Sequence, residues 1–462
     1  MKRYLVHLFW LLPFIGAAQQ HNDKDAFFIR EIHRQALVHG EAMQQLTILS
    51  EQIGGRLAGS EQSAKAVAHC ADYLKSLGVD TVYLQPCEVP RWERGEPETV
   101  EITVLGQSET LPLHALALGN SIGTGPTGLM AEAVEVKTLD EVDSLGEQLR
   151  GKIVFFNERM DDGELNTFSA YGKAAGSRVR GASRAARYGA VGVLVRSLTT
   201  QIDEVPHTGT LVYEEGIPRI PAMAISTMDA EKLSDLLESR TVQVFMRSTC
   251  QILESAISHN VVAEIKGTAY PEDIILVGGH LDSWDVGGGA HDDGAGCVHA
   301  MEVMRLIKAM NYQPKRSIRC VLFMNEENGL GGGKAYQAAS FAAGEYHMAA
   351  IESDRGGFTP RGFTVEGHES VLKNKFRKLS DWLPLLEPYG LGFRLGGSGA
   401  DISGLKNQKG LLIGFEPDTQ RYFDYHHTAI DRIEAVNERE LELGAAAMMS
   451  LVYLLDQYGL GE

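Results

Sequence analysis

The chain has 462 residues, of which 44% are apolar, and it carries a formal net charge of −18 at pH 7. A chain of this length is too long to fold around one ordinary hydrophobic core, so we expect two or three domains. The acidic balance argues against nucleic acid as a partner, because phosphate binding needs clustered basic side chains.

Residues 1–18 have the layout of a cleavable secretory signal peptide. Lys2 and Arg3 precede a short apolar run, and the small residues 16–18 follow it. A buried N-terminal helix is the alternative, but the basic start and the small-residue end favour a signal. A lipoprotein anchor is not expected, because no cysteine lies near the cleavage point. A membrane span is not expected either, because no run of about 18 apolar residues follows. We therefore expect a secreted or periplasmic protein.

Two segments with different patterns follow the signal. In residues 19–119, which we assign to the first part of a main domain, Ser60 can cap a helix that Gly78 can end. Residues 120–247 begin with a glycine-rich stretch and continue with one helix-like segment and short β-like runs such as "KIVFFN" and "AVGVLVRS". We expect this second segment to be a small inserted α/β domain.

Residues 248–462 are expected to form the second part of the main domain. Amphipathic helical segments alternate here with four short apolar runs, which read "DIILVGGH", "SIRCVLFMNEE", "HMAAIESD" and "GLLIGFEPD". Such runs suit strands buried on both faces, and the alternation predicts a largely parallel sheet. Cys297 and Cys320 fall within these apolar patterns and are expected in the core. Five cysteines in all argue against a disulfide-stapled scaffold.

Polar residues collect where the predicted strands end. His280 ends the first run, Glu326 and Glu327 end the second, and Asp354 ends the third. Each has a simple structural explanation alone, such as a core histidine or a solvated turn. Because the carboxyl ends of strands line the ligand crevice of an α/β sheet, their common placement indicates a binding site.

The residue types at these positions favour zinc. Imidazole and carboxylate groups without a thiolate suit a catalytic zinc site. Two metals about 4 Å apart need a bridging carboxylate, and Asp292 fits that role. His280 and Asp354 could complete one metal, and Glu327 with a downstream histidine the other. Glu326 is then free to accept a proton from water.

Four motifs together resemble the co-catalytic zinc peptidases of the M28 type: "GGHLDSWDVGGGAHDDGAG", "NEENGLGGG", "ESD" and "HHTAID". The resemblance extends along nearly the whole chain after the signal. It implies an α/β zinc-exopeptidase fold, with a mostly parallel mixed sheet flanked by helices. It also implies that the inserted segment is a protease-associated-type α/β domain, which covers the cleft and helps to form a possible homodimer.

The resemblance also assigns roles to individual residues. It implies two Zn²⁺ ions, with Glu326 as general base and with the following ligands: His280, Asp292, Glu327, Asp354 and His427. Asp292 would bridge the metals, and the pattern His-Thr-x-x-Asp selects His427 rather than His426 as the ligand. Asp282 would orient the imidazole of His280, and Asp293 would support the loop of Asp292.

Substrate contacts are harder to assign from the sequence. Candidates are Arg196, His207, His426 and Asp401, although each has an equally plausible structural role. Two departures from the family pattern, Asn325 before the glutamate pair and Ala400 beside Asp401, leave the ligands intact. Ala400 is expected to alter substrate contacts near Asp401, so the family's specificity is not carried over there. His291 and Asp285 are expected to be ordinary loop residues.

We expect a secreted di-zinc exopeptidase that hydrolyses dipeptides or short peptides. The sequence does not separate aminopeptidase, carboxypeptidase and dipeptidase preferences. One alternative is a non-catalytic, receptor-like binding module of the same fold, which bound zinc would argue against. Another is a single-zinc aminoacyltransferase resembling the glutaminyl cyclases, which a stoichiometry of two zincs would dismiss.

Overall fold

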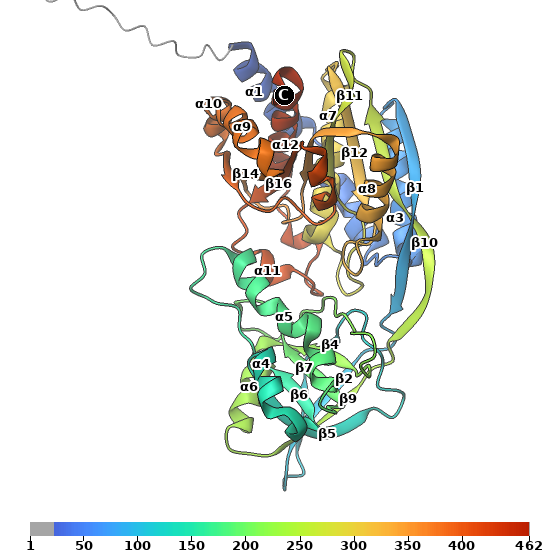
Figure 1. Ribbon diagram of the computed structural model, residues 1–462, viewed down its shortest axis with the longest axis vertical. Coiled ribbons are helices and arrows are strands. Elements are labelled where there is room, and N and C mark those ends of the chain that lie inside the picture. The colour runs from blue at the N-terminus through green and yellow to red at the C-terminus, as the bar shows by residue number, and fades with distance from the viewer. Residues whose placement is uncertain (1–22, 462) are drawn as a thin grey trace, which may run out of the picture.

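The computed structural model describes residues 23–461 and has two halves along its long axis (Figure 1). The upper half in this view contains an eight-stranded sheet in the order β1-β10-β12-β11-β13-β16-β14-β15. Its strands are β1 (Thr81–Glu93), β10 (Gln251–Ile265), β11 (Tyr270–His280), β12 (Arg316–Phe323), β13 (Tyr346–Glu352), β14 (Pro360–Gly367), β15 (Gly392–Leu395) and β16 (Leu411–Pro417). The central strands β12, β11, β13 and β16 are parallel, while β10 and β14 join them antiparallel. This confirms the expected mixed, mostly parallel α/β sheet.

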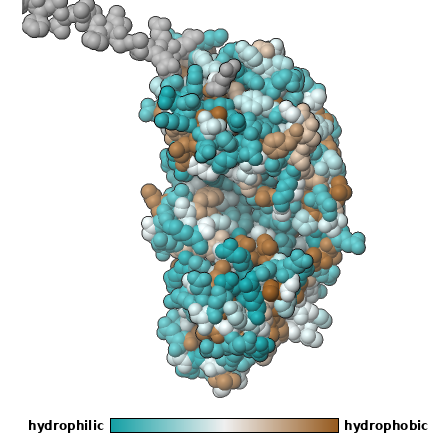
Figure 2. Space-filling model, in the orientation of Figure 1, coloured by the Kyte–Doolittle hydropathy of each residue, from teal (hydrophilic) through white to brown (hydrophobic). Residues whose placement is uncertain are grey.

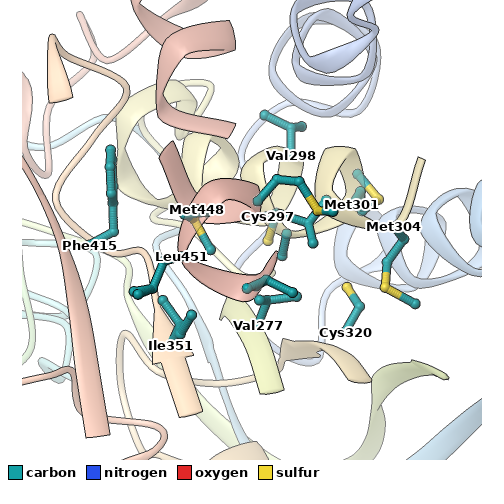
Figure 3. Close-up of a cluster of buried hydrophobic side chains, with 14 of the residues drawn as sticks. Val277, Cys297, Val298, Met301, Met304, Cys320, Ile351, Phe415, Met448 and Leu451 are labelled. Carbon is teal, nitrogen blue, oxygen red and sulfur yellow. The ribbon is translucent and has the colours of Figure 1, made fainter. Parts of the chain in front are cut away.

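Helices pack on this sheet because its strands are apolar on both faces. Alternate residues of β11 enter different core clusters: Ile275 and Val277 lie on one side, and Leu276 lies on the other. Figure 3 shows Val277 packed with Met301 and Met448, which come from the two long helices over that face. The helices of this half are α1 (Asp23–His39), α2 (Ala42–Thr47), α3 (Glu61–Ser76), α7 (Ala295–Ala309), α8 (Gly331–Ala343), α9 (Glu369–Ser380), α10 (Leu383–Leu386), α11 (Tyr422–Tyr425) and α12 (Glu438–Tyr458).

Shorter helical turns connect these elements. Two are π-helical, η1 (Ile48–Ile53) and η3 (Ala290–Gly294). Three are 3₁₀ turns of the same half, η4 (Glu387–Tyr389), η5 (Ser403–Gln408) and η6 (Ile433–Ala435). The turn η3 matters most for function because it carries the central residues of the acidic, glycine-rich motif.

The lower half is built on a second eight-stranded sheet, in the order β3-β2-β9-β5-β6-β7-β8-β4. Its strands are β2 (Thr99–Val104), β3 (Thr110–Leu113), β4 (Ala115–Ala117), β5 (Leu129–Val136), β6 (Ile153–Phe156), β7 (Gly192–Arg196), β8 (Ala222–Ile225) and β9 (Val242–Arg247). It carries the helices α4 (Leu139–Leu145), α5 (Thr167–Ala186) and α6 (Thr227–Leu237) and the 3₁₀ turn η2 (Gly146–Leu149). The expected start of the inserted segment, residue 120, falls after β2, β3 and β4. Strand β2 pairs with β9, β4 pairs with β8, and β3 pairs with β2, so the second half begins no later than Thr99.

The state of the cysteines and the polarity of the surface match what the sequence predicts. All five cysteines are buried free thiols, and Cys297 and Cys320 lie in the main core as expected. The face shown in Figure 2 is mostly hydrophilic, and its hydrophobic residues are scattered. Within residues 23–461, no helix combines the length and apolarity needed to cross a bilayer. The expected signal peptide, residues 1–18, lies outside the described part of the chain.

Candidate metal centre

The predicted ligands meet at one edge of the first sheet. His280 is the last residue of β11, and the loop after β12 carries Glu326 and Glu327. Asp354 follows β13 by two residues. Because β11, β12 and β13 are parallel neighbours, their carboxyl ends place these side chains together. Asp292 of η3 lies between them.

Each carboxylate oxygen of Asp292 faces a different histidine. Oδ1 lies 3.3 Å from His280 Nε2, and the same nitrogen lies 3.4 Å from Asp354 Oδ1. Oδ2 lies 3.3 Å from His427 Nε2, which in turn is 3.1 Å from Glu327 Oε2. The five predicted ligands thus form two groups that share the Asp292 carboxylate.

The chemistry of this cluster fits metal ions. Asp292 Oδ2 and Glu327 Oε1 are buried without a hydrogen-bond partner, which is costly unless another group supplies one. On both histidines the Nδ1–H donates to a backbone carbonyl, from His280 to Asp282 at 3.0 Å and from His427 to Thr208 at 3.3 Å. The Nε2 atoms therefore face the cluster, where each can bind a metal ion once it has lost its proton. Imidazole nitrogens and carboxylate oxygens, without a thiolate, are suitable zinc ligands.

Electrostatics hold opposite charges together in this cluster. Burial alone would lower the pKa of His427, but Glu327 and Asp292 outweigh it and raise that pKa to about 10. Burial would raise the pKa of Asp292, yet contacts with His280 and His427 hold it well below its usual range. Burial and the nearby Asp354 carboxylate, opposed by His280, raise the pKa of Glu326 well above the usual value. A raised pKa makes Glu326 a stronger proton acceptor when ionised.

The cluster opens into a cavity of about 410 Å³. The ligands other than His280 line one side, together with Glu326 and His426. The other side is formed by the second half of the molecule, mainly by Phe168, Tyr171 and Arg178 of α5. The catalytic candidates thus lie in a cleft between the two halves.

Comparison with known proteins identifies the family. Residues 260–452 match the model of peptidase family M28. The chain is 34% identical to Carboxypeptidase Q of Bos taurus over 424 residues, which are 90% of this chain and 86% of the relative. It is 33% identical to Carboxypeptidase Q of Homo sapiens, with the same shares covered. The chain belongs to peptidase family M28.

Solved structures agree with membership of the M28 family. An M28 peptidase precursor from Shewanella amazonensis SB2B superposes with a TM-score of 0.88 at 33% identity, over 94% of this chain and 97% of that one. A zinc aminopeptidase from Bacillus subtilis has a TM-score of 0.62 at 21% identity, over 89% and 94% of the two chains. At that identity, the second likeness describes the fold alone.

Asp282 supports the M28 site differently from the prediction. Its carboxylate lies 3.9 Å from His280 Nδ1, and its backbone carbonyl is what accepts the imidazole N–H. The carboxylate instead accepts the backbone N–H groups of Asn325, Glu326 and Glu327, at 2.6, 3.0 and 3.3 Å. Asp282 therefore positions the general base candidate and one metal ligand through the backbone of their loop.

The other predicted supports lie close to the ligands. Asp293 accepts the backbone N–H of His280 at 2.9 Å and that of Gly296 at 3.0 Å, so it joins the end of β11 to the start of α7. His291 stacks on Phe358 with 4.1 Å between ring centroids, which is a structural role. Asp285 is more than a loop residue, since it lies 2.7 Å from Arg94 in an ion pair.

Two further supports were missed from the sequence. Arg56, fully buried, donates to the backbone carbonyls of residues 281, 288 and 289 and so ties the motif loop together. Asp431 accepts the backbone N–H groups of His291 and Asp292 at 2.8 and 3.1 Å. The signal for Asp431 was present, because it is the aspartate of the His-Thr-x-x-Asp pattern.

Of the four predicted substrate contacts, only His426 lines the cavity. It stacks on His427, with ring centroids 3.4 Å apart. Arg196 instead forms an ion pair with Glu231 at 2.6 Å, while His207 and Asp401 are buried and do not line the cavity. The cavity arginine is Arg178, which the sequence analysis did not select.

Proposed function

We propose that the chain is a di-zinc exopeptidase that hydrolyses dipeptides or short peptides. The observation that carries this proposal is the Asp292 carboxylate, whose two oxygens each lie 3.3 Å from a histidine Nε2 atom. Each of these nitrogens also lies close to one further carboxylate, of Asp354 or of Glu327. Family membership supports peptide hydrolysis, and the name of the mammalian relatives supports an exopeptidase. A cavity of about 410 Å³ suits a short substrate.

The chain's own residues divide the work of hydrolysis. His280, Asp354 and Asp292 would hold one zinc ion, and Glu327, His427 and Asp292 the other. Bound zinc supplies Lewis acidity, which polarises a peptide carbonyl and lowers the pKa of water. Glu326 lines the cavity beside this cluster, accepts the proton of the attacking water and passes it to the leaving amine. Asp282 holds the Glu326 backbone in place during both transfers.

Two other functions fit the site less well. A receptor-like binding module of the same fold needs no complete ligand set, whereas in this chain all five candidate ligands and a candidate base lie in one cluster. A single-zinc aminoacyltransferase does not need an aspartate shared by two histidine groups. The arrangement around Asp292 therefore favours the two-zinc peptidase.

Export and assembly complete the proposal. We propose that residues 1–18 are removed as a secretory signal and that the mature chain is secreted or periplasmic. The second half would cover the cleft and take part in a homodimer, as the family resemblance implies. Neither point is needed for the chemistry of the metal centre.

The function can be tested with Glu326→Gln. Purified parent protein is expected to contain two zinc ions per chain, to lose peptide hydrolysis with a chelator and to regain it with zinc. Glu326→Gln is expected to keep both zinc ions but to lower kcat by about 100-fold or more, since general base catalysis typically contributes that much. The control is Glu272→Gln, which changes an exposed glutamate at the start of β11. Turnover by Glu326→Gln equal to that of the parent would refute the assignment.

A further inference from the structure

Arg178 is a buried cation in the wall of the active-site cavity. Its side chain is only 6% exposed, and it is the one arginine or lysine among the described residues that line this cavity. The opposite wall is acidic, with Asp292, Glu326, Glu327 and Asp354. A substrate in the cavity therefore meets carboxylates and metal on one side and a single guanidinium on the other.

The guanidinium of Arg178 lacks an anionic partner. Nη2 donates to the Tyr171 hydroxyl at 2.6 Å, and the group lies over the Tyr171 ring at 5.3 Å from its centroid. Nε has no hydrogen-bond partner, and within residues 23–461 no carboxylate forms an ion pair with Arg178. A buried charge without a counter-charge is costly, so an anion entering the cavity would supply a missing interaction. By contrast, Arg196 has its partner in Glu231.

Gly209 places this guanidinium beside the metal centre. A Cβ added at Gly209 would lie 2.5 Å from Arg178 Nη1 and 2.7 Å from His427 Nδ1, so the two side chains flank the same glycine. Its φ of +135° is also a conformation that other residues rarely adopt. The backbone is therefore built to let the cation approach a metal ligand closely.

The spacing suits the C-terminus of a short peptide. When the scissile carbonyl lies at the metal centre, the carboxylate of a C-terminal residue lies about one residue further on, roughly 3.5 Å along the chain. The Nη1 and Nη2 atoms of a guanidinium offer two parallel N–H donors to a carboxylate, and Tyr171 engages only one N–H of Nη2. An ammonium group would instead be repelled here.

We infer that Arg178 binds the free C-terminal carboxylate of the substrate and so gives the enzyme a preference for cleaving off the last residue. This inference rests on the proposed peptidase function and adds the direction of cleavage to it. It also gives α5, in the second half of the molecule, a direct part in substrate selection.

The test compares a dipeptide with its amide. Alanyl-alanine and its C-terminal amide are given to the parent, Arg178→Met, Arg178→Lys and Arg180→Met. The last is a matched control, because Arg180 is exposed two residues further along the same helix. We expect the parent to prefer the free acid, and Arg178→Met to lower the ratio of kcat/KM for acid over amide by about 100-fold, mainly through KM. Arg178→Lys should restore part of the preference, and Arg180→Met should keep the parent ratio.

Two results would overturn the inference. If Arg178→Met leaves the acid-to-amide ratio unchanged, the guanidinium does not read the C-terminus. If it lowers kcat equally for both peptides, the side chain acts on the reacting centre or on the fold instead. Thermal unfolding of each variant separates loss of fold from loss of recognition.

A binding experiment keeps this inference separate from the proposed function. Calorimetry measures binding of the same two peptides to Glu326→Gln, with and without Arg178→Met. If the parent hydrolyses neither peptide, the proposed function fails, and the binding data alone decide the inference. A preference for the acid that Arg178→Met removes supports it, and equal binding of acid and amide overturns it.

Discussion

The buried carboxylate of Glu442, in α12, gives a quantitative test of the fold that does not involve the metal centre: the pH dependence of stability. One carboxylate oxygen accepts the Ala42 backbone N–H at 3.0 Å, and the other is buried without a partner. Burial, and then the nearby Glu302, raise the pKa of Glu442 from 4.5 to about 8. The folded state therefore holds this proton more tightly than the unfolded state. The contribution of Glu442 to stability is highest below pH 4.5 and falls as the pH rises to about 8, by about 5 kcal/mol in all.

Glu442→Gln removes this ionisation. The glutamine oxygen can still accept the Ala42 N–H, but its amide replaces the unpartnered oxygen at a cost of about 1–3 kcal/mol. We expect the variant to be less stable than the parent at pH 5 and more stable at pH 9, as measured by urea unfolding at both values. The control is Glu438→Gln, because Glu438 is exposed in the first turn of the same helix. If the parent and Glu442→Gln lose equal stability between pH 5 and 9, the assigned environment of Glu442 is wrong.

Two further predictions concern the supports of the metal centre. Asp282→Asn is expected to weaken zinc binding on the Glu327 side by about 10- to 100-fold, because the carboxylate accepts three N–H groups of the ligand loop. Competition with a chelator measures this, and unchanged affinity would contradict it. Arg56→Met removes three hydrogen bonds to backbone carbonyls and is expected to lower the free energy of unfolding by about 3 kcal/mol. A change below about 1 kcal/mol in urea unfolding would show that the motif loop holds itself together.

The main sheet and the ligand positions could be predicted from the sequence because they follow local rules. Apolar runs of strand length end in His280, in the Glu326 pair and just before Asp354, and parallel strands bring such ends together. The family motifs then selected His427, which comes from a distant part of the chain. No local pattern shows that this histidine lies beside Asp292, so only the resemblance could join them before the structure was known.

The roles of Asp282 and Arg178 could not be predicted from local sequence patterns or from strand ends. Spacing placed Asp282 beside His280, but which of its oxygens meets the imidazole depends on the path of the backbone after β11. Arg196 is the last residue of strand β7, and the ligands were located by the rule that strand ends line a binding site. In the second sheet, however, that strand end faces Glu231. The second half begins earlier than residue 120 because the short strands β2 and β4 pair with β9 and β8, which lie far along the chain.

The junction between the halves has a consequence for engineering. The chain leaves the first sheet at the end of β1 and returns at the start of β10, where Glu93 and Gln251 are partners in the same antiparallel ladder. The second half is thus a cassette whose two ends lie side by side, as at the base of a hairpin. A two-residue turn could close that gap and leave the ladder in register. The shortened protein would retain all five ligands while losing α5, and would turn the covered cleft into an open zinc-binding face.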